Sequence, residues 1–290
     1  MKMHTDETRV NDEKILNKTM ERDDLDTEHA RRIIDDLNCL ILSMKEKSLV
    51  MSNWYGYITD DPEAESHEGV GVPNRGQNYL PIDGAADDGR FPWYLYWEIV
   101  SVMTGEPQLK RNDVVLDAGG TSSLFSCYLS SLGLDVHSID LNQDIIVIGD
   151  QLASGMGWNM TSRQMDMRKL DYPDDFFDHA FSVCVFEHLD YQVKQDALKE
   201  ISRVLKPGGV LRVTFDYKNP APDVHGKGPD SGLENALRNE ADIRRSFLNT
   251  DKFGLLGNQT FHDNGKTYLV NHRLGNQPYT FGVLHLVNVK

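Results

Sequence analysis

The sequence predicts an α/β fold, in which a doubly wound, mostly parallel sheet carries an N-terminal helical cap. From about residue 112 onward, apolar segments typical of strands alternate with amphipathic segments typical of helices. Such alternation indicates a parallel sheet with helices on both faces. The chain has 290 residues, of which 39% are hydrophobic. This length suits one large domain with attachments or two small domains.

Four segments precede the alternating region. Residues 1–28 are polar and acidic, and we expect an arm that is disordered or loosely held. From Glu28 to Ser48 the apolar residues recur at helical spacing, which predicts an amphipathic helix. Residues 60–90 are rich in glycine, proline and aspartate and predict a long loop. The aromatic stretch at 90–100, RFPWYLYWEIV, predicts the start of a buried helix.

The alternating region divides into four strands, three helices and a terminal pair of strands. The strands are expected at 114–116, 135–140, 179–186 and 210–217. The helices are expected at 124–132, 143–154 and 191–205. The stretches 267–272 and 281–289 predict two further strands, paired as an antiparallel hairpin.

Charge and composition exclude several classes of protein. The net charge is −15, and so acidic a surface repels phosphate backbones, so we expect no nucleic-acid partner. No apolar stretch is long enough to span a bilayer, and the N-terminus lacks the apolar centre of a signal peptide. We therefore expect a cytoplasmic protein with no membrane partner. Its three cysteines show no metal-type spacing. The oligomeric state stays open.

The stretch VVLDAGGTSSLFS, residues 114–126, places Gly119 and Gly120 at the end of the first predicted strand. Glycine there allows a tight turn and a close approach to a ligand. Asp140 ends the second strand, where a carboxylate accepts hydrogen bonds from the ribose hydroxyls of an adenosine. This geometry serves NAD, FAD and S-adenosylmethionine alike. Helix capping by Asp140 is the alternative.

Thr121 and Ser123 stand where a dinucleotide-binding loop has its later glycines. Those glycines make room for a pyrophosphate at the helix N-terminus. S-adenosylmethionine has no phosphate, so their absence favours it as the ligand. Its amino acid end needs hydrogen bonds, which Asp117 and the Gly119 backbone can supply. Thr121 and Ser123 are alternatively helix-capping residues without ligand contact.

These residues together resemble the class I S-adenosylmethionine-dependent methyltransferases. Asp117-Ala-Gly119-Gly120 is similar to the start of that family's D-x-G-x-G-x-G motif, and Asp140 to its ribose-binding acid. The stretches around MDM at 165–167 and EISRVLKPGGVLRVTF at 200–215 also resemble the family in the right order. The resemblance covers about 112–216 well and 266–290 loosely.

The resemblance implies S-adenosylmethionine as cofactor and a seven-stranded sheet whose C-terminal strand is antiparallel. It further implies that Asp166 faces the adenine amino group and that Met167 lies by the ring. An ordinary loop acid and plain packing are the respective alternatives. The cofactor-binding residues expected on this basis are Asp117, Gly119, Gly120, Thr121, Asp140, Leu141, Asp166, Met167 and Val185.

FEHL, residues 186–189, is the expected chemical centre, at the end of the fourth strand. Methyl transfer requires the nucleophile and the methyl group to be held at attack distance in a dry site. An oxygen nucleophile benefits from losing its proton, and histidine is suited to accept it near neutral pH. We therefore expect Glu187 and His188 to be catalytic, with His188 as the base. Alternatively, His188 orders the loop or contacts the cofactor.

The expected domains are the arm (1–28), a helical cap with a lid loop (29–105), and a methyltransferase domain (106–290). The last contains an acceptor-binding insertion at about 217–260. Asp216, His225 and Asp230 lie in or beside this insertion, but their spacing is no ligand signature, so we expect no metal site.

The function expected from the resemblance is methyl transfer to a small polar acceptor in small-molecule biosynthesis, at the oxygen of a sugar or natural-product scaffold. Two alternatives are a nicotinamide-dependent oxidoreductase and a non-catalytic binding protein on a methyltransferase fold. The first needs a fuller glycine fingerprint, which the sequence lacks.

Overall fold

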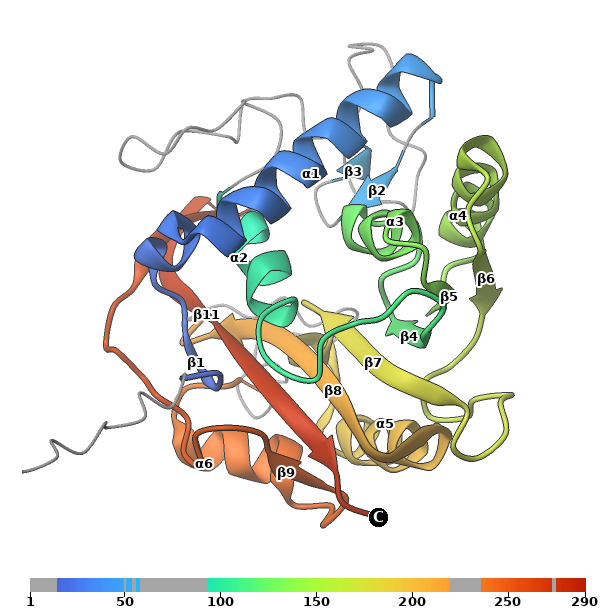
Figure 1. Cartoon of the computed structure of the whole chain (residues 1–290). Coiled ribbons are helices and arrows are strands. Elements are labelled where there is room, and N and C mark those ends of the chain that lie inside the picture. The colour runs from blue at the N-terminus through green and yellow to red at the C-terminus, as the bar shows by residue number, and fades with distance from the viewer. Residues whose placement is uncertain (1–14, 50, 54–55, 58–92, 220–235, 273–274) are drawn as a thin grey trace, which may run out of the picture.

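A computed structural model describes the chain at residues 15–49, 51–53, 56–57, 93–219, 236–272 and 275–290 (Figure 1). Within these ranges, nine strands form one sheet, whose main path runs in the order β1-β11-β8-β7-β4-β5-β6. Two short strands, β9 and β10, also pair with β11. A separate two-stranded ladder joins β2 (Ser52–Asn53) and β3 (Gly56–Tyr57).

Five strands of this sheet are mutually parallel: β4 (Val114–Ala118), β5 (Asp135–Asp140), β6 (Met160–Gln164), β7 (Phe177–Val183) and β8 (Leu205–Tyr217). The long strand β11 (Gly275–Asn288) runs antiparallel beside β8. The predicted fold class is thereby confirmed. Because the chain leaves β4 on one side for β5 and returns on the other side as β7, the strand order reverses at β4. Ligands of such sheets bind at this switch point, outside the carboxyl ends of the strands.

Three short strands cover the outer edge of β11. They are β1 (Lys18–Thr19), β9 (Phe253–Leu255) and β10 (Tyr268–His272), all antiparallel to β11. A C-terminal hairpin is present, but β10 pairs with residues 275–279 of β11, whereas most of the strand expected at 281–289 pairs with β8. Covering the edge in this way removes unpaired backbone groups from a long strand.

The expected loosely held arm is wrong for residues 15–28, because residues 18–20 bond to β11 and residues 22–26 form a 3-10 turn in which Asp24 accepts a hydrogen bond from the Trp97 indole. Leu16 and Met20 are buried on either side of β1, and the Asn17 side chain donates to the backbone oxygens of Leu256 and Asn258. The sequence prediction failed because only two residues pair in the strand and only two apolar side chains are buried. So small a number cannot be recognised in a segment of polar composition. Residues 1–14 lie outside the described part of the chain.

Helices cover both faces of the sheet (Figure 1). One face carries α2 (Trp93–Val102), α3 (Leu124–Ser131) and α4 (Gln143–Met156), with α1 (Glu28–Glu46) laid across α2 and α3. The opposite face carries α5 (Tyr191–Val204), α6 (Glu240–Ile243) and the π-helical turn η3 (Arg244–Leu248). Each face has its own hydrophobic core, as a doubly wound sheet requires.

The predicted N-terminal helix is α1. Thr27 caps it, because its hydroxyl accepts the Ala30 amide hydrogen bond at 3.1 Å. The buried stripe contains the residues that the periodicity selects: Ile33, Leu37, Leu40, Ile41 and Met44. The predicted aromatic helix is α2, in which Tyr94 stacks on Phe281 of β11 at 5.2 Å between ring centroids. The expected loop at 60–90 lies outside the described residues.

Three other predictions differ from the structure in detail. The strand expected at 179–186 ends at Val183, and a 3-10 turn, η2 (Phe186–His188), follows it. The strand expected to begin after Pro-Gly-Gly begins at Leu205, which already pairs with Phe177. The short strands β6 and β9 were not predicted, because neither contains a continuous apolar run. None of the described helices is long and apolar enough to cross a membrane.

Candidate active site

The loop between β4 and α3 contains two glycines whose surroundings leave no room for a side chain at either position. Gly119 has φ +86°, and a Cβ atom there would lie 2.7 Å from Cγ2 of Val185. A Cβ atom on Gly120 would lie 2.4 Å from Oδ2 of Asp117. The Gly119 amide donates to the Ile139 carbonyl at 2.8 Å, which holds the loop beside the end of β5. The structure therefore brings Asp117, both glycines and Val185 together, as the sequence predicts.

Polar side chains, not further glycines, complete this loop. The Thr121 and Ser138 hydroxyls are hydrogen-bonded at 2.9 Å, which ties the loop to β5. Ser122 is buried with φ +63°. Ser123 caps α3, because its hydroxyl accepts the Ser126 amide hydrogen bond at 3.2 Å. The capping interpretation therefore holds for Ser123, and Thr121 is anchored to the neighbouring strand.

The Asp117 carboxyl lies behind the loop. It is fully buried, and its Oδ2 accepts a hydrogen bond from the Ser126 hydroxyl. Its Oδ1 has no hydrogen-bond partner among the described residues. Burial raises the pKa of Asp117 to about 7. The Asp117 side chain thus packs against the inner side of the loop. A contact between Asp117 and a cofactor stays a prediction.

Asp140 is half-buried at the carboxyl end of β5, next to the glycine loop. Its Oδ1 accepts the Asn142 amide hydrogen bond at 2.9 Å. The cap of α4 is Asn142, whose own side chain accepts from the Asp144 amide at 2.9 Å. Helix capping, the alternative role for Asp140, is therefore filled by another residue. Leu141 follows with 67% of its surface exposed. Both residues therefore lie at the carboxyl end of β5, where the sheet faces solvent.

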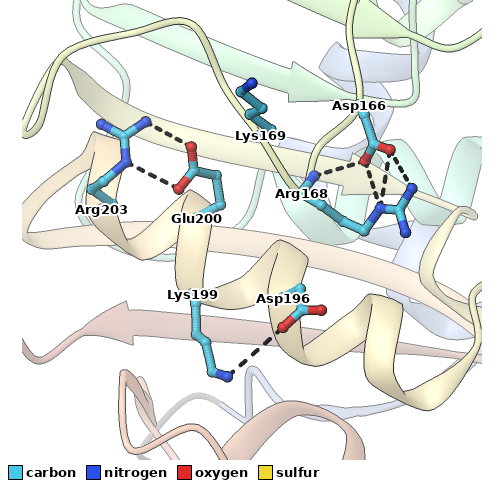
Figure 2. Close-up of a pocket in the computed structure, with 7 residues that line it drawn as sticks. All are labelled: Asp166, Arg168, Lys169, Asp196, Lys199, Glu200 and Arg203. Carbon is cyan, nitrogen blue, oxygen red and sulfur yellow. Dashed lines mark hydrogen bonds and ion pairs between the residues drawn. The ribbon is translucent and has the colours of Figure 1, made fainter.

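The Asp166 carboxylate is engaged elsewhere. It forms a two-oxygen ion pair with Arg168, at 3.0 Å from Nε to Oδ1 and 2.6 Å from Nη2 to Oδ2. This pair lowers the pKa of Asp166. Figure 2 shows both residues in a surface pocket with four residues of α5. Met167 packs against the core on the α5 face. These contacts favour the ordinary loop acid and plain packing over adenine recognition.

Glu187 and His188 lie together in η2, at the carboxyl end of β7. The Glu187 side chain is 4% exposed, and its Oε1 accepts the Asp216 amide hydrogen bond at 3.4 Å. The His188 Nε2 lies 3.9 Å from the same oxygen, and its side chain is 16% exposed. Burial raises the pKa of Glu187 to about 7. Since Val185 begins this turn and contacts Gly119, the expected catalytic pair lies beside the expected cofactor loop.

Two buried acids lie next to Glu187, of which sequence reasoning missed Glu98 and considered Asp216 only together with His225 and Asp230. Glu98 lies on α2 and is fully buried, and Asp216 ends up 6% exposed in β8. Each is a single acid inside an apolar run, YLYWEIV and RVTFDY, and that placement was the available signal. Asp216 does lie with possible metal ligands, but these are Cys184 and Glu187. His225 and Asp230, considered with it from the sequence, lie outside the described residues.

Comparison with known proteins identifies the family of the domain. Residues 116–213 match the family described as a methyltransferase domain. The ubiquinone/menaquinone biosynthesis C-methyltransferase UbiE of Neisseria gonorrhoeae is 33% identical over 120 residues, which are 40% of this chain and 47% of that protein. UbiE of Azotobacter vinelandii is 36% identical over 129 residues, 42% and 49% of the two chains. This chain thus spans about half the length of the curated relatives it matches.

A solved structure shows the same fold. The [4+2]-cyclase SpnF superposes with a TM-score of 0.51 at 20% sequence identity. The superposition covers 70% of this chain and 86% of SpnF.

Proposed function

Because this chain contains a class I S-adenosylmethionine-dependent methyltransferase domain, we propose that it transfers a methyl group from S-adenosylmethionine to a small polar acceptor. The observation that carries the proposal is the closed glycine loop at the switch point, with Asp140 at the end of the adjacent strand. A carboxylate at this position can accept hydrogen bonds from both hydroxyls of an adenosyl ribose. Asp140 and Leu141 lie at the solvent-facing end of β5, so a ribose can reach the Asp140 carboxylate.

The capped N-terminus of α3 supports S-adenosylmethionine over a dinucleotide. A pyrophosphate binds the free amide groups in the first turn of such a helix. Here the Ser123 hydroxyl already accepts the Ser126 amide, and Thr121 and Ser123 stand where the later glycines would lie. A cofactor without a phosphate does not need the backbone amides in the first turn of α3. This argues against the nicotinamide-dependent alternative.

His188 is the proposed base. Displacement at the methyl group needs an acceptor atom with an available electron pair, so removal of its proton speeds the step. Glu187 lies behind the imidazole, 3.9 Å from Nε2, where its carboxylate stabilises the imidazolium that forms. The two residues lie next to the glycine loop through Val185, where the donor methyl group would be presented.

The acceptor is proposed to be a sugar or natural-product scaffold that is methylated at oxygen. The net charge of −15 supports a small molecule over a nucleic acid. A carbon acceptor is the second candidate, because the curated relatives are named C-methyltransferases. Both reactions use the same base, since loss of a hydroxyl proton activates either the oxygen or a carbon conjugated to it.

A fold alone does not fix the reaction, and SpnF carries the name of a cyclase. Calorimetric titration of the full chain with S-adenosylmethionine, S-adenosylhomocysteine and NAD therefore tests the proposal. We expect saturable one-site binding of both adenosyl ligands and none of NAD. Binding of NAD alone would overturn the proposal. Binding of the adenosyl ligands without label transfer to any small acceptor would favour the non-catalytic alternative.

A further inference from the structure

Four chemically reactive side chains converge at the carboxyl ends of β7 and β8, beneath α2. They come from three separate elements: Glu98 from α2, Cys184 and Glu187 from the turn after β7, and Asp216 from β8. One ligand atom each from Cys184, Glu187 and Asp216 lie within 4.8 Å of one another. The Cys184 sulfur also contacts Oε1 of Glu98. We call these four residues the buried acid cluster.

Each acid of the cluster has one oxygen without a hydrogen bond. Glu98, Glu187 and Asp216 are 0%, 4% and 6% exposed. Their oxygens Oε2, Oε2 and Oδ1 are closed to solvent and have no partner in the described part of the chain. A buried polar atom without a partner costs about 1–3 kcal/mol, and more if it is charged. Three such atoms on residues of one cluster indicate a missing positive ligand.

The other oxygens of these acids are already used within the protein. Glu98 Oε1 contacts the Cys184 thiol, and Asp216 Oδ2 accepts from the Asn219 side chain at 2.7 Å. Glu187 Oε1 accepts the Asp216 amide. The unpartnered oxygens are therefore the ones left for a ligand.

We propose that the buried acid cluster binds a divalent transition-metal ion of the Zn²⁺ type. The ligands are the Cys184 thiolate and the carboxylates of Glu98, Glu187 and Asp216. The ion must be small, because the free oxygens are closed to solvent. Sulfur together with carboxylate oxygen suits Zn²⁺, whereas Mg²⁺ and Ca²⁺ prefer oxygen alone.

The distances agree with a single ion. Zinc–sulfur bonds of about 2.3 Å and zinc–oxygen bonds of about 2.0–2.2 Å, arranged tetrahedrally, place ligand atoms about 3.3–3.7 Å apart. Ligand atoms of Cys184, Glu187 and Asp216 lie within 4.8 Å of one another, and Glu98 contacts the Cys184 sulfur, so side-chain rotations can complete the site. Binding releases the thiol proton and any carboxyl protons to solvent. The ion would join α2 to η2 and β8, and so fix the turn that carries Val185 and His188.

Metal retention by the full-length chain tests this proposal. The protein is stripped with a chelator, loaded with Zn²⁺, dialysed and analysed for metal. We expect one Zn²⁺ per chain in the unsubstituted protein and an affinity lower by about tenfold or more in Cys184→Ser and Asp216→Asn. Cys39→Ser and Cys127→Ser are matched controls, because these cysteines lie on α1 and α3, outside the cluster. Both controls should retain the ion.

Cobalt supplies a second readout that needs no variant. Co²⁺ bound by a thiolate gives a charge-transfer absorption in the near ultraviolet, which we expect in the unsubstituted protein and not in Cys184→Ser. Glu98→Gln keeps the side-chain volume if the other variants fail to fold. No retained metal in the unsubstituted protein, equal retention in Cys184→Ser, or a cobalt spectrum without that absorption would overturn the proposal. None of these measurements involves S-adenosylmethionine, so they are independent of the proposed methyl transfer.

Discussion

The two halves of the sheet's carboxyl edge differ in how their polar groups are satisfied. At the ends of β4 and β5, Thr121 and Ser123 bond to neighbouring groups and Asp140 keeps one side open to solvent, although the buried Asp117 keeps one unpartnered oxygen. At the ends of β7 and β8, the acids are buried and still have unpartnered oxygens. The first half thus presents the Asp140 carboxylate at the surface for the ribose hydroxyls of the proposed cofactor. The second needs protons or a cation within the fold.

His188 connects the two halves, and its substitution should have the largest effect. His188→Ala should lower the rate of methyl transfer by about 100- to 10,000-fold, the usual contribution of a general base. Binding of S-adenosylmethionine should be unchanged. The rate is measured as labelled methyl transferred to the acceptor, with the exposed His262→Ala as control. An unchanged rate would assign His188 to ordering the loop.

Gly119 tests how tightly the two halves are packed together. Gly119→Ala places a Cβ atom against Val185 in a left-handed conformation, and should cost about 1–3 kcal/mol of unfolding free energy as well as cofactor affinity. Gly157→Ala is the matched control, because Gly157 has φ +70° but no atom near its Cβ position. Denaturant unfolding should show a larger loss for Gly119→Ala. Equal losses would mean that the contact with Val185 has no energetic role.

The double variant Gly119→Ala with Val185→Ala sharpens that result. Removing the valine methyl groups opens space for the new Cβ atom. Part of the loss should therefore be recovered.

A pH dependence distinguishes the supporting acid, Asp117, from the surface acid, Asp166. The pKa of Asp117 is raised to about 7 in the folded protein, so the folded state binds more protons than the unfolded state between about pH 4 and pH 7. Its contribution to the unfolding free energy is therefore present at low pH and falls as the pH rises through about 7. We expect Asp117→Asn to reduce the difference in stability between pH 5 and pH 8 by an amount on the order of 2 kcal/mol.

Asp166→Asn is the control for this measurement. Its pKa is lowered by Arg168, so its contribution has the opposite sign and is lost as the pH falls. This variant should leave the fall in stability between pH 5 and pH 8 in place. A fall that Asp117→Asn does not reduce would show that the Asp117 carboxyl is ionised in the folded protein.

Local sequence patterns explain why much of the site at the ends of β4 and β5 could be predicted. The strand, the two glycines and the capping serine follow one another between residues 114 and 126, so their spacing alone indicates a turn into a helix. The same is true of α1, whose stripe repeats every three or four residues. Asp140 is recognisable because it ends the next strand.

The site at the ends of β7 and β8 depends on contacts between distant parts of the chain. Glu98 and Cys184 are separated by 86 residues, and no periodicity links them. Asp166 illustrates the converse problem, because its position fits the family motif while its carboxylate pairs with Arg168 two residues away. The packing of residues 15–20 against β11, more than 260 residues later in the chain, was equally hidden.

The most direct test of the central claim is the affinity of Asp140→Ala for S-adenosylmethionine, measured by calorimetry beside Asp144→Ala and Asp166→Ala. Asp144 is exposed in the first turn of the following helix, so its substitution changes the charge but not the proposed ribose contact. Loss of two hydrogen bonds to a carboxylate should weaken binding by about 10- to 100-fold in Asp140→Ala. The other two variants should bind like the unsubstituted protein. Unchanged affinity in Asp140→Ala, or a greater loss in Asp166→Ala, would contradict the assignment of the ribose to this strand end.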